Sequence, residues 1–324
     1  METPTRILAI RLTAIGDVVL TLPAVSVLRQ NFPAAKITFL TTKENAALLQ
    51  GFRDVDETIL LDRSVFRSGN PWRIGREFLR LTRALRAGKF LLVVDWQANG
   101  ESAWLTRLTG AQRRWGFVKK SPRRWAYTKT FGHPRLHPAE SNCALLGHCG
   151  LVVDAVKNEF ILPAEALLAA QNFFATNNLV PGQPTLFVQP FTSAAHKNWP
   201  LENFLALAKH WQARGWQIIF GGGPADVPAL EPARTLGFVI SAGVPLLVTG
   251  GLMQLSTFIV GGDTGALHLA VAQGKRVVML MSSGRPGRPH PFRHPEWTLA
   301  PAVEQDIVSL KLADVIAACE AAAG

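Results

Sequence analysis

The strongest constraint on the fold of this chain is a repeated alternation of short apolar runs with longer stretches of helical periodicity. Eight runs are expected to be strands, four in each half: residues 7–12, 37–40, 58–61 and 90–95, then 185–189, 217–220, 256–260 and 276–280. Helical patterns lie between most of them, among others at residues 201–214 and 266–273. Strands that alternate with helices form a parallel sheet covered by helices on both faces. The sequence therefore predicts an α/β protein with two doubly wound domains.

The boundary between the two domains is expected near residue 164. Residues 164–178 have a helical composition, and residues 179–184, which include Pro181, Gly182 and Pro184, are typical of a turn. We therefore expect an N-terminal domain over residues 1–163 and a C-terminal domain over residues 164–324. The Ala-rich tail at residues 306–323 is predicted to be a helix. Packing back on the first domain and packing on the second both remain open for it.

The chain is strongly basic, which restricts its partners. Its 34 Lys and Arg residues exceed its 23 Asp and Glu residues, giving a net charge of +11 at pH 7. This balance favours nucleic acid, phosphorylated metabolites or an anionic membrane surface. The three cysteines indicate a reducing compartment, and the first residues lack the pattern of a secretory signal. Because no apolar run reaches the roughly 18 residues that span a bilayer, we expect a cytoplasmic protein.

The loop after the first predicted strand is one place to look for chemistry. In a doubly wound sheet, ligands bind beyond the carboxyl ends of the strands. This loop contains Gly16, which allows a tight backbone turn, followed by the lone carboxylate of Asp17. Such a carboxylate is either a general base for a substrate hydroxyl or a cap of the following helix, and both interpretations remain open.

The corresponding loop of the second half is a candidate anion site. It contains the hydroxyls of Thr192 and Ser193 and the ammonium of Lys197, and a helix begins after Pro200. These groups suit a phosphate, although the spacing is not that of a Walker A loop. A solvated lysine in an ordinary loop is the competing interpretation.

Two more loops of the second half have features of a nucleotide site. Asp263 and Thr264 lie among glycines, and Gly265 opens a helix on which His268 shares a face with Thr264. Free N–H groups at the start of a helix can bind a diphosphate. We therefore favour a diphosphate site over the alternative interpretation, a purely structural turn. The other loop, residues 221–226, ends in Asp226, which either holds ribose hydroxyls or caps the next helix.

These four loops resemble those of the lipopolysaccharide heptosyltransferases, glycosyltransferase family nine. The similar stretches are residues 6–23, 95–102, 192–200 and 261–270, so the resemblance spans nearly the whole chain. It implies the GT-B fold, in which two Rossmann-like domains face a central cleft. It also implies inverting transfer of a heptose from ADP-heptose to the inner core of lipopolysaccharide, with Kdo or heptose as the acceptor sugar.

The resemblance also implies roles for individual residues. Asp17 matches the general base, and Lys197 matches the residue that stabilises the departing ADP. The donor contacts implied by the family's pattern are Thr192, Ser193, Lys197, Asp263, Thr264, Gly265 and His268, with Asp226 in place of the family's ribose-binding Glu. Candidates on the acceptor side are Gly16, Arg63, Arg67 and Gln97. For the two arginines, contact with the acidic sugar Kdo and ordinary surface charge both remain open.

No metal or other cofactor is expected. A lysine and a helix N-terminus can stabilise a leaving diphosphate without one. The pair Asp54 and Asp56 has the spacing of a metal-binding Asp-x-Asp motif, but it precedes a strand, and we interpret it as a solvated turn. The trio Cys143, His148 and Cys149 matches no zinc-binding spacing and is predicted to lie on one helix.

Residues 102–139 are expected to form a basic-aromatic surface. They contain nine Lys or Arg residues and no Asp or Glu, interleaved with Trp104, Trp115, Trp125 and Tyr127. Such a surface suits RNA or anionic lipid headgroups. Because no nucleic-acid motif accompanies it, we favour peripheral contact with lipopolysaccharide or with the inner face of the inner membrane.

Two other functions compete with heptose transfer. A nucleotide-sugar epimerase of the GT-B fold needs no acceptor, and the Asp17 loop, which matches the transferase motif, argues against it. A non-catalytic transferase-like binding protein need not keep Asp17, Lys197 and Asp263, all of which are present.

Overall fold

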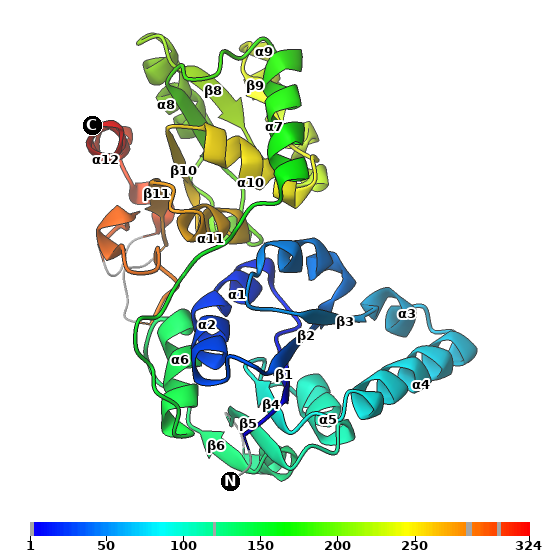
Figure 1. Ribbon diagram of the computed structural model, residues 1–324. Helices are drawn as coiled ribbons and strands as arrows, with labels where there is room; N and C mark the ends of the chain where they lie inside the picture. Colours follow the sequence, from blue (N-terminus) through cyan, green and yellow to red (C-terminus); the bar gives the residue numbers. More distant parts are fainter. Residues whose placement is uncertain (1–2, 119–120, 283–286, 303–305) are drawn as a thin grey trace. The chain divides into compact units, whose positions relative to one another are not determined.

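Two separate six-stranded parallel sheets organise the chain (Figure 1). The computed structural model describes residues 3–118, 121–282, 287–302 and 306–324. It divides into two compact units, Met1–Glu159 and Phe160–Gly324, each built on one sheet. The first unit therefore ends slightly before the boundary expected from composition, because Phe160 already donates its backbone N–H to Ala272 of the second unit.

The first sheet has the strand order β3-β2-β1-β4-β5-β6. Its strands are β1 (Arg6–Ile10), β2 (Lys36–Thr42), β3 (Glu57–Leu61), β4 (Leu92–Asp95), β5 (Arg113–Phe117) and β6 (Lys129–Phe131), all paired in parallel. The central strand β1 is almost wholly apolar, as expected for a strand buried on both faces. Since the order reverses between β1 and β4, the loops after these two strands lie at the switch point where ligands bind.

Helices cover both faces of the first sheet (Figure 1). They are α1 (Ile15–Val19), α2 (Leu22–Asn31), α3 (Arg63–Arg67), α4 (Pro71–Ala87), α5 (Gly100–Leu108) and α6 (Pro138–His148), with 3-10 turns η1 (Lys43–Gly51) and η2 (Ser121–Ala126). Leu81 and Leu85 of α4 and Leu105 of α5 share one core cluster with Leu8 and Ile10 of β1. Helices α2 and α6 pack together on the other face.

The second sheet has the order β12-β11-β10-β7-β8-β9. Its strands are β7 (Thr185–Gln189), β8 (Gln217–Phe220), β9 (Val239–Ile240), β10 (Phe258–Gly262), β11 (Val277–Leu280) and β12 (Thr298–Leu299), again all parallel. Its helices are α7 (Ala164–Thr176), α8 (Leu201–Gln212), α9 (Glu231–Thr235), α10 (Leu246–Leu255), α11 (Gly265–Ala272) and α12 (Leu312–Ala323). Short 3-10 turns complete it: η3 (Ala195–Lys197), η4 (Pro224–Asp226), η5 (Pro228–Leu230), η6 (Pro295–Trp297) and η7 (Ile307–Ser309).

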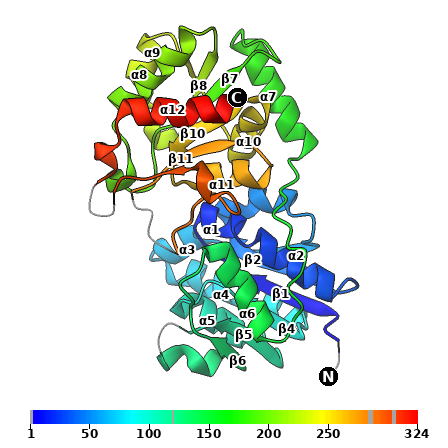
Figure 2. The same ribbon diagram turned by 90° about the vertical axis from the view of Figure 1, so that its left-hand side faces the viewer.

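The C-terminal helix α12 packs on the second sheet. Helix α12 lies beside α8 (Figure 2). Its Val315 and Cys319, four residues apart on one helix face, are fully buried in a core cluster with Phe204 and Trp211 of α8. A second cluster, with residues of α7, α10 and α11, fills the opposite face of the sheet. Of the two placements considered for the tail, the structure thus places its apolar face in the second unit's core.

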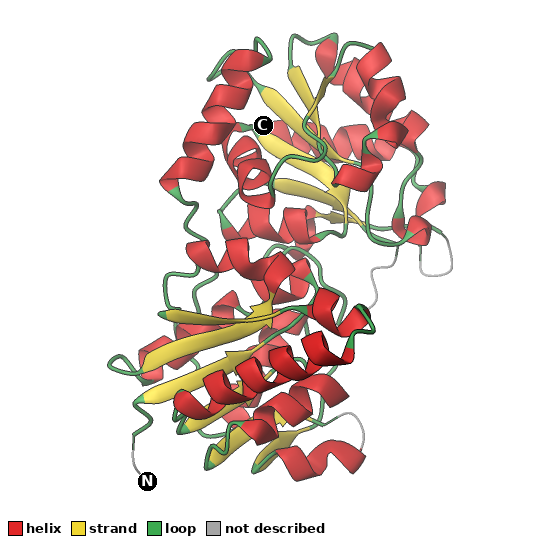
Figure 3. Cartoon of the chain, turned by 90° about the vertical axis from the view of Figure 1, so that its right-hand side faces the viewer, coloured by secondary structure: helices red, strands yellow, loops and turns green. Residues whose placement is uncertain are grey.

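Strands lie where the apolar runs were expected, with two kinds of difference. The structure adds β5, β6, β9 and β12, which are short or begin with polar residues (Figure 3). Strand β10 starts two residues later than expected and continues through Gly261 and Gly262, which were assigned to the following loop. A Cβ on Gly261 would lie 2.4 Å from the carbonyl oxygen of Gln189, so the neighbouring strand leaves room only for glycine. Within the described ranges, no helix is both long and apolar enough to cross a bilayer.

Candidate functional site

Asp17 lies at the carboxyl edge of the first sheet, on the short helix α1 that follows β1. Its Oδ2 accepts a hydrogen bond from the backbone N–H of Ala14 at 3.2 Å and lies 2.7 Å from Nη2 of Arg11. Asp17 therefore closes the first turn of its own helix and does not cap α2. With 40% of its side chain exposed, the carboxylate stays accessible to a substrate. Gly16, half-buried, precedes it in the same turn.

Gln97 holds the loop that leads to Asp17. Its Oε1 accepts hydrogen bonds from the backbone N–H groups of Leu12 and Thr13, at 2.9 and 3.1 Å. Arg11 adds a second tie, because its Nη1 donates to the carbonyl of Trp96 at 2.5 Å. Gln97 was expected to contact the acceptor sugar, but in the structure its amide oxygen already accepts these two backbone hydrogen bonds.

Asp95 fixes the turn that carries Gln97, a role that the sequence did not predict. Its carboxylate is fully buried and accepts hydrogen bonds from the Tyr127 hydroxyl at 2.6 Å and from the N–H groups of Gln97 and Ala98 at 2.8 and 3.2 Å. Burial raises the pKa of Asp95, and these hydrogen bonds oppose that rise. All three of these donors are neutral, and two of them are backbone N–H groups, so the carboxylate holds the backbone of this turn in place.

Arg63 and Arg67 follow strand β3, where they begin and end the short helix α3 that Asp62 caps. The guanidinium of Arg63 pairs with Glu101 on α5 and donates to the Thr13 hydroxyl at 3.4 Å. Arg63 therefore borders the Asp17 loop, and Glu101 is its unpredicted partner. Arg67 is exposed at the end of the helix.

In the second unit, the largely buried carboxylate of Asp263 lies between a lysine ammonium and a histidine ring. Asp263 follows β10; its Oδ2 lies 3.0 Å from Nζ of Lys197, and its Oδ1 lies 3.2 Å from Nε2 of His268. The exposed side-chain fractions are 12% for Asp263, 26% for Lys197 and 3% for His268. Burial alone would raise the pKa of Asp263, but His268 and Lys197 together lower it. This cluster brings together three predicted donor residues and keeps its carboxylate ionised.

The N-terminus of helix α11 begins beside this cluster. Thr264 is the N-cap residue, and its hydroxyl oxygen accepts a hydrogen bond from the N–H of Leu267 at 3.3 Å. Gly265 is the first helical residue. The positive end of the helix and the ammonium of Lys197 therefore act on the same region, which suits an anion.

The loop after β7 packs against the end of β10. A Cβ on Gly262 would lie 2.4 Å from Cγ2 of Thr192, so the two segments are in close contact. Thr192 accepts at Oγ1 from the N–H of Ala194 and donates to its carbonyl, and the N–H of Thr192 donates to Oδ1 of Asn198 at 2.8 Å. The hydroxyl of Thr192 is thus used within the loop, whereas Ser193 is exposed.

Asp226 caps a short turn in the loop after β8. Its Oδ2 accepts a hydrogen bond from the N–H of Gly223 at 2.8 Å and closes η4. Asp226 therefore closes its own turn and does not cap the next helix, and contact with ribose hydroxyls stays a prediction.

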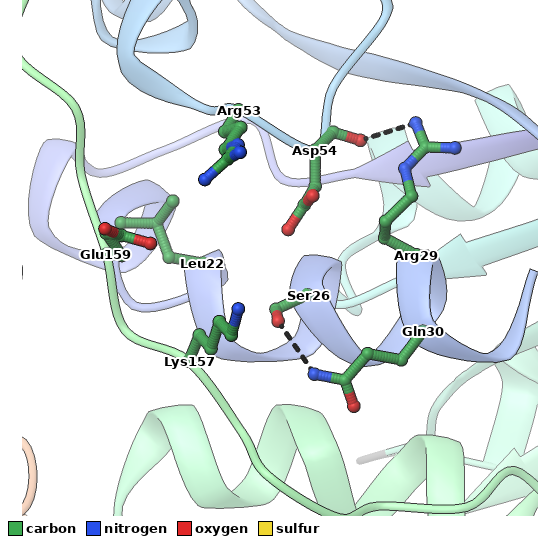
Figure 4. Close-up of a pocket in the computed structure, with 8 residues that line it drawn as sticks. All are labelled: Leu22, Ser26, Arg29, Gln30, Arg53, Asp54, Lys157 and Glu159. Atoms are coloured by element: carbon green, nitrogen blue, oxygen red, sulfur yellow. Dashed lines mark hydrogen bonds between the residues drawn. The ribbon is translucent and has the colours of Figure 1, made fainter. Parts of the chain in front are cut away.

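A pocket of about 270 Å³ lies on the flank of α2 in the first unit (Figure 4). Its lining contains none of the predicted site residues and is mostly charged or polar: Leu22, Ser26, Arg29, Gln30, Arg53, Asp54, Lys157 and Glu159. Asp54 is half-buried here, and burial raises its pKa, so it is not the solvated residue that we expected. Asp56 instead accepts from Arg29 at 2.6 Å and from the N–H of Ile37 at 2.7 Å.

Within residues 3–118, 121–282, 287–302 and 306–324, no group of three or more His, Cys, Asp or Glu side chains could hold a metal ion. Cys143 and His148 lie on α6, and Cys149 is its C-cap residue, which confirms the prediction that the trio belongs to one helix.

Only part of the predicted basic-aromatic surface is at the surface. Trp104 and Trp125 are 62% and 45% exposed and contact each other edge-to-face, with ring centroids 4.6 Å apart. Trp115 and Tyr127 are buried, because Trp115 lies in strand β5 and Tyr127 reaches Asp95. Lys119 and Lys120 lie outside the described residues.

Known proteins with similar sequences point to one family. A model of glycosyltransferase family 9 (heptosyltransferase) matches residues 78–303. Lipopolysaccharide heptosyltransferase 1 of Pseudomonas aeruginosa is 26% identical over 296 residues, which cover 87% of this chain and 80% of that protein.

Solved structures share the fold. The glycosyl transferase family 9 structure from Veillonella parvula superposes with a TM-score of 0.89 at 20% identity, covering 100% of this chain and 98% of its own. A heptosyltransferase of Escherichia coli with ADP has a TM-score of 0.78 at 20% identity, covering 98% and 99%. A UDP-GlcNAc 2-epimerase from Methanocaldococcus jannaschii is more distant, at a TM-score of 0.54 and 12% identity, with coverages of 98% and 93%. The two doubly wound sheets are those of the GT-B fold.

Proposed function

Because the chain belongs to glycosyltransferase family 9, the heptosyltransferases, we propose that it moves a heptose from ADP-heptose to the inner core of lipopolysaccharide, with inversion at the anomeric carbon. The chain is a glycosyltransferase by its family; the donor, the acceptor and the residue roles below are the proposal. The observation that carries it is the cluster of Lys197, Asp263 and His268 beside the N-terminus of α11.

The second unit supplies the donor site in this proposal. The diphosphate of ADP-heptose binds at the start of α11, near Thr264 and Gly265, and Ser193 and Thr192 approach it from the loop after β7. Lys197, which now pairs with Asp263 at 3.0 Å, lies close enough to neutralise the diphosphate as it leaves. Preorganised positive charge of this kind stabilises the developing anion without a metal. A ribose contact from Asp226 would complete the site.

Asp17 acts as the general base in the first unit. Its carboxylate takes the proton from the acceptor hydroxyl while the hydroxyl oxygen attacks the anomeric carbon of the heptose. The bond between that carbon and the diphosphate oxygen breaks, and ADP leaves with the electron pair. Arg11 and the N–H of Ala14 hold the carboxylate in place, and its exposure lets the acceptor reach it.

Acceptor recognition falls to the rim around Asp17. Arg63 and Arg67 on α3 provide positive charge for an acidic sugar such as Kdo, and a heptose is the other acceptor class. Gly16 lets the acceptor approach the backbone, and Gln97 keeps the loop in position through its two backbone hydrogen bonds. The proposed reaction needs no metal, and we propose no nucleic-acid partner. We also propose peripheral contact with the inner face of the inner membrane, where the exposed part of the basic-aromatic surface faces acidic headgroups.

The experiment that tests this function is thermal stabilisation by nucleotides. ADP and ADP-heptose are compared with UDP, GDP and dTDP, each with and without EDTA. At about a hundred times its dissociation constant, a ligand adds roughly 2.7 kcal/mol to the stability of the folded protein. We expect selective stabilisation by ADP and ADP-heptose that EDTA leaves unchanged. Stabilisation by another nucleotide alone would contradict the donor, and conversion of the nucleotide sugar without any acceptor would favour the epimerase.

A further inference from the structure

The outer face of helix α4 has an unusual composition. Five residues follow each other at spacings of four, three, four and three: Trp72, Arg76, Leu79, Arg83 and Arg86. This spacing places all five on one side of an α-helix. We call this set the α4 stripe. At 1.5 Å per residue, it runs for about 21 Å along a helix of 17 residues.

The α4 stripe is exposed although it contains two large apolar side chains. Trp72 is 88% exposed, the highest value among the large apolar side chains of the described chain, and Leu79 is 46% exposed. On the opposite side of the same helix, Leu81 and Leu85 are buried in the core of the first unit. Because the opposite side of α4 packs against the core, Trp72 and Leu79 on the outer side cannot be buried there as well.

All charge on the exposed side of α4 is positive. The one carboxylate of the helix, Glu77, lies on the inner side, where it is 9% exposed and pairs with Arg80 at 2.6 Å. The three arginines of the stripe are exposed, and they form no salt bridge within the described residues. The neighbouring helix α3 continues this chemistry with the exposed side chains of Phe66 and Arg67.

We propose that the α4 stripe is a docking surface for an anionic lipid bilayer. The helix lies in the plane of the membrane, with Trp72 and Leu79 inserted at the level of the headgroups and the arginines on lipid phosphates. A tryptophan suits this interface because its ring is apolar and its N–H remains near water. A second copy of the chain is a poorer partner, since it presents the same positive face. A nucleic acid would leave Leu79 without an apolar environment.

This surface is distinct from residues 102–139. There, Trp104 and Trp125 pack on each other, and Arg123 donates to the carbonyl of Ala98, so part of the surface is engaged within the first unit. The docking by α4 requires no donor or acceptor sugar, and it can be measured in the absence of transfer.

The test is sedimentation of the full chain with vesicles. Vesicles of two parts phosphatidylcholine to one part phosphatidylglycerol are compared with vesicles of phosphatidylcholine alone. We expect binding to the anionic vesicles only. The triple variant R76A/R83A/R86A should lower the partition coefficient roughly a hundredfold, about fivefold for each arginine. Trp72→Ala should lower it about tenfold, because the ring no longer enters the interface.

Matched controls come from the basic-aromatic surface. The variant R107A/R124A/R135A removes the same charge from exposed positions, and Trp104→Ala removes an exposed tryptophan. Both should lower the partition coefficient by less than the matching change in the α4 stripe, because we expect the basic-aromatic surface to be the weaker of the two membrane contacts. Equal or larger losses in these controls would overturn the proposal, as would equal binding to neutral vesicles or unchanged binding of Trp72→Ala. Thermal stabilisation by ADP should be the same in all variants, so that failure of docking and failure of the proposed function are told apart.

Discussion

The two sheets have the same strand order, and their corresponding strands carry buried carboxylates in opposite environments. Starting from β3 and from β9, the orders are 3-2-1-4-5-6 and 9-8-7-10-11-12, so β4 corresponds to β10. Asp95 ends β4 among neutral donors, and burial raises its pKa. Asp263 follows β10 between Lys197 and His268, which lower its pKa. The carboxylate at the end of this strand therefore holds a backbone turn in the first unit, whereas it takes part in a charged cluster in the second.

Asp17 is an accessible carboxylate at the carboxyl edge of the first sheet, and its removal should have the largest effect. General-base catalysis contributes roughly 10²- to 10⁴-fold to a rate, so Asp17→Asn should lower heptose transfer by about 10³-fold. ADP binding should stay unchanged, because Asp17 acts on the acceptor. Asp314→Asn, at an exposed position of α12, is the matched control. Transfer assays with ADP titrations decide the point; loss of ADP affinity with turnover intact would contradict the role.

Lys197 tests the charged site of the second unit. Lys197→Ala should weaken both ADP binding and turnover, each by about ten- to a hundredfold, because one cation facing the diphosphate is lost. Lys209→Ala on the exposed side of α8 removes the same charge away from the site. The two variants are compared by ADP titration and by steady-state kinetics. Unchanged kinetics in Lys197→Ala would exclude this lysine from the site.

Asp263 makes a prediction about acid stability. Its folded pKa lies below the ordinary value of 3.8, so its stabilising contribution is present above that value and disappears as the pH falls through the folded pKa. Because Asn keeps the shape of the side chain but loses the charge on its hydrogen bonds, Asp263→Asn should cost about 1–3 kcal/mol at neutral pH, and the difference from the wild type should shrink in acid. Denaturant unfolding at a series of pH values measures this difference; a constant gap would show that the carboxylate's charge is not what stabilises the fold.

Asp95 should contribute to stability with the opposite pH trend. Its folded pKa lies above 3.8, so ionisation costs stability above the folded pKa, and that cost vanishes as the pH falls toward 3.8. Tyr127→Phe removes one hydrogen bond to the carboxylate and should cost about 1 kcal/mol at neutral pH. The cost should decrease in acid as Asp95 becomes protonated. The same unfolding series reports this cost, and a cost that increases in acid would contradict a hydrogen bond from Tyr127 to the ionised Asp95 carboxylate.

The sequence predicted the parts of the fold that depend on local pattern. Strands β7 and β8 have the expected bounds, since each is a short apolar run flanked by turn residues. Strand β5 escaped detection because Arg113 and Arg114 begin it, and only its pairing with β4 and β6 makes it a strand. Two-residue strands such as β9 are defined by a neighbouring strand and leave no periodic signal.

Site residues could be predicted singly, but not their partners. The position of Thr264 and His268 on one helix face follows from spacing alone. The ion pair of Asp263 with Lys197 joins residues 66 positions apart, and it exists only because β7 lies beside β10. In the same way, Gln97 reaches the loop after β1 across 85 positions. No local rule encodes these distances, whereas the family's motifs indicate which residues are candidates for the site.

The order of the units along the chain has a consequence for synthesis. All six strands of the first sheet come from residues 6–131, and the first unit ends at Glu159. Domains generally fold as units during translation, the N-terminal one first. The first unit can therefore complete its core while the ribosome is still producing the second, and α4 is then already folded with its outer face exposed. A nascent chain of this protein would be able to meet a membrane before its second unit exists.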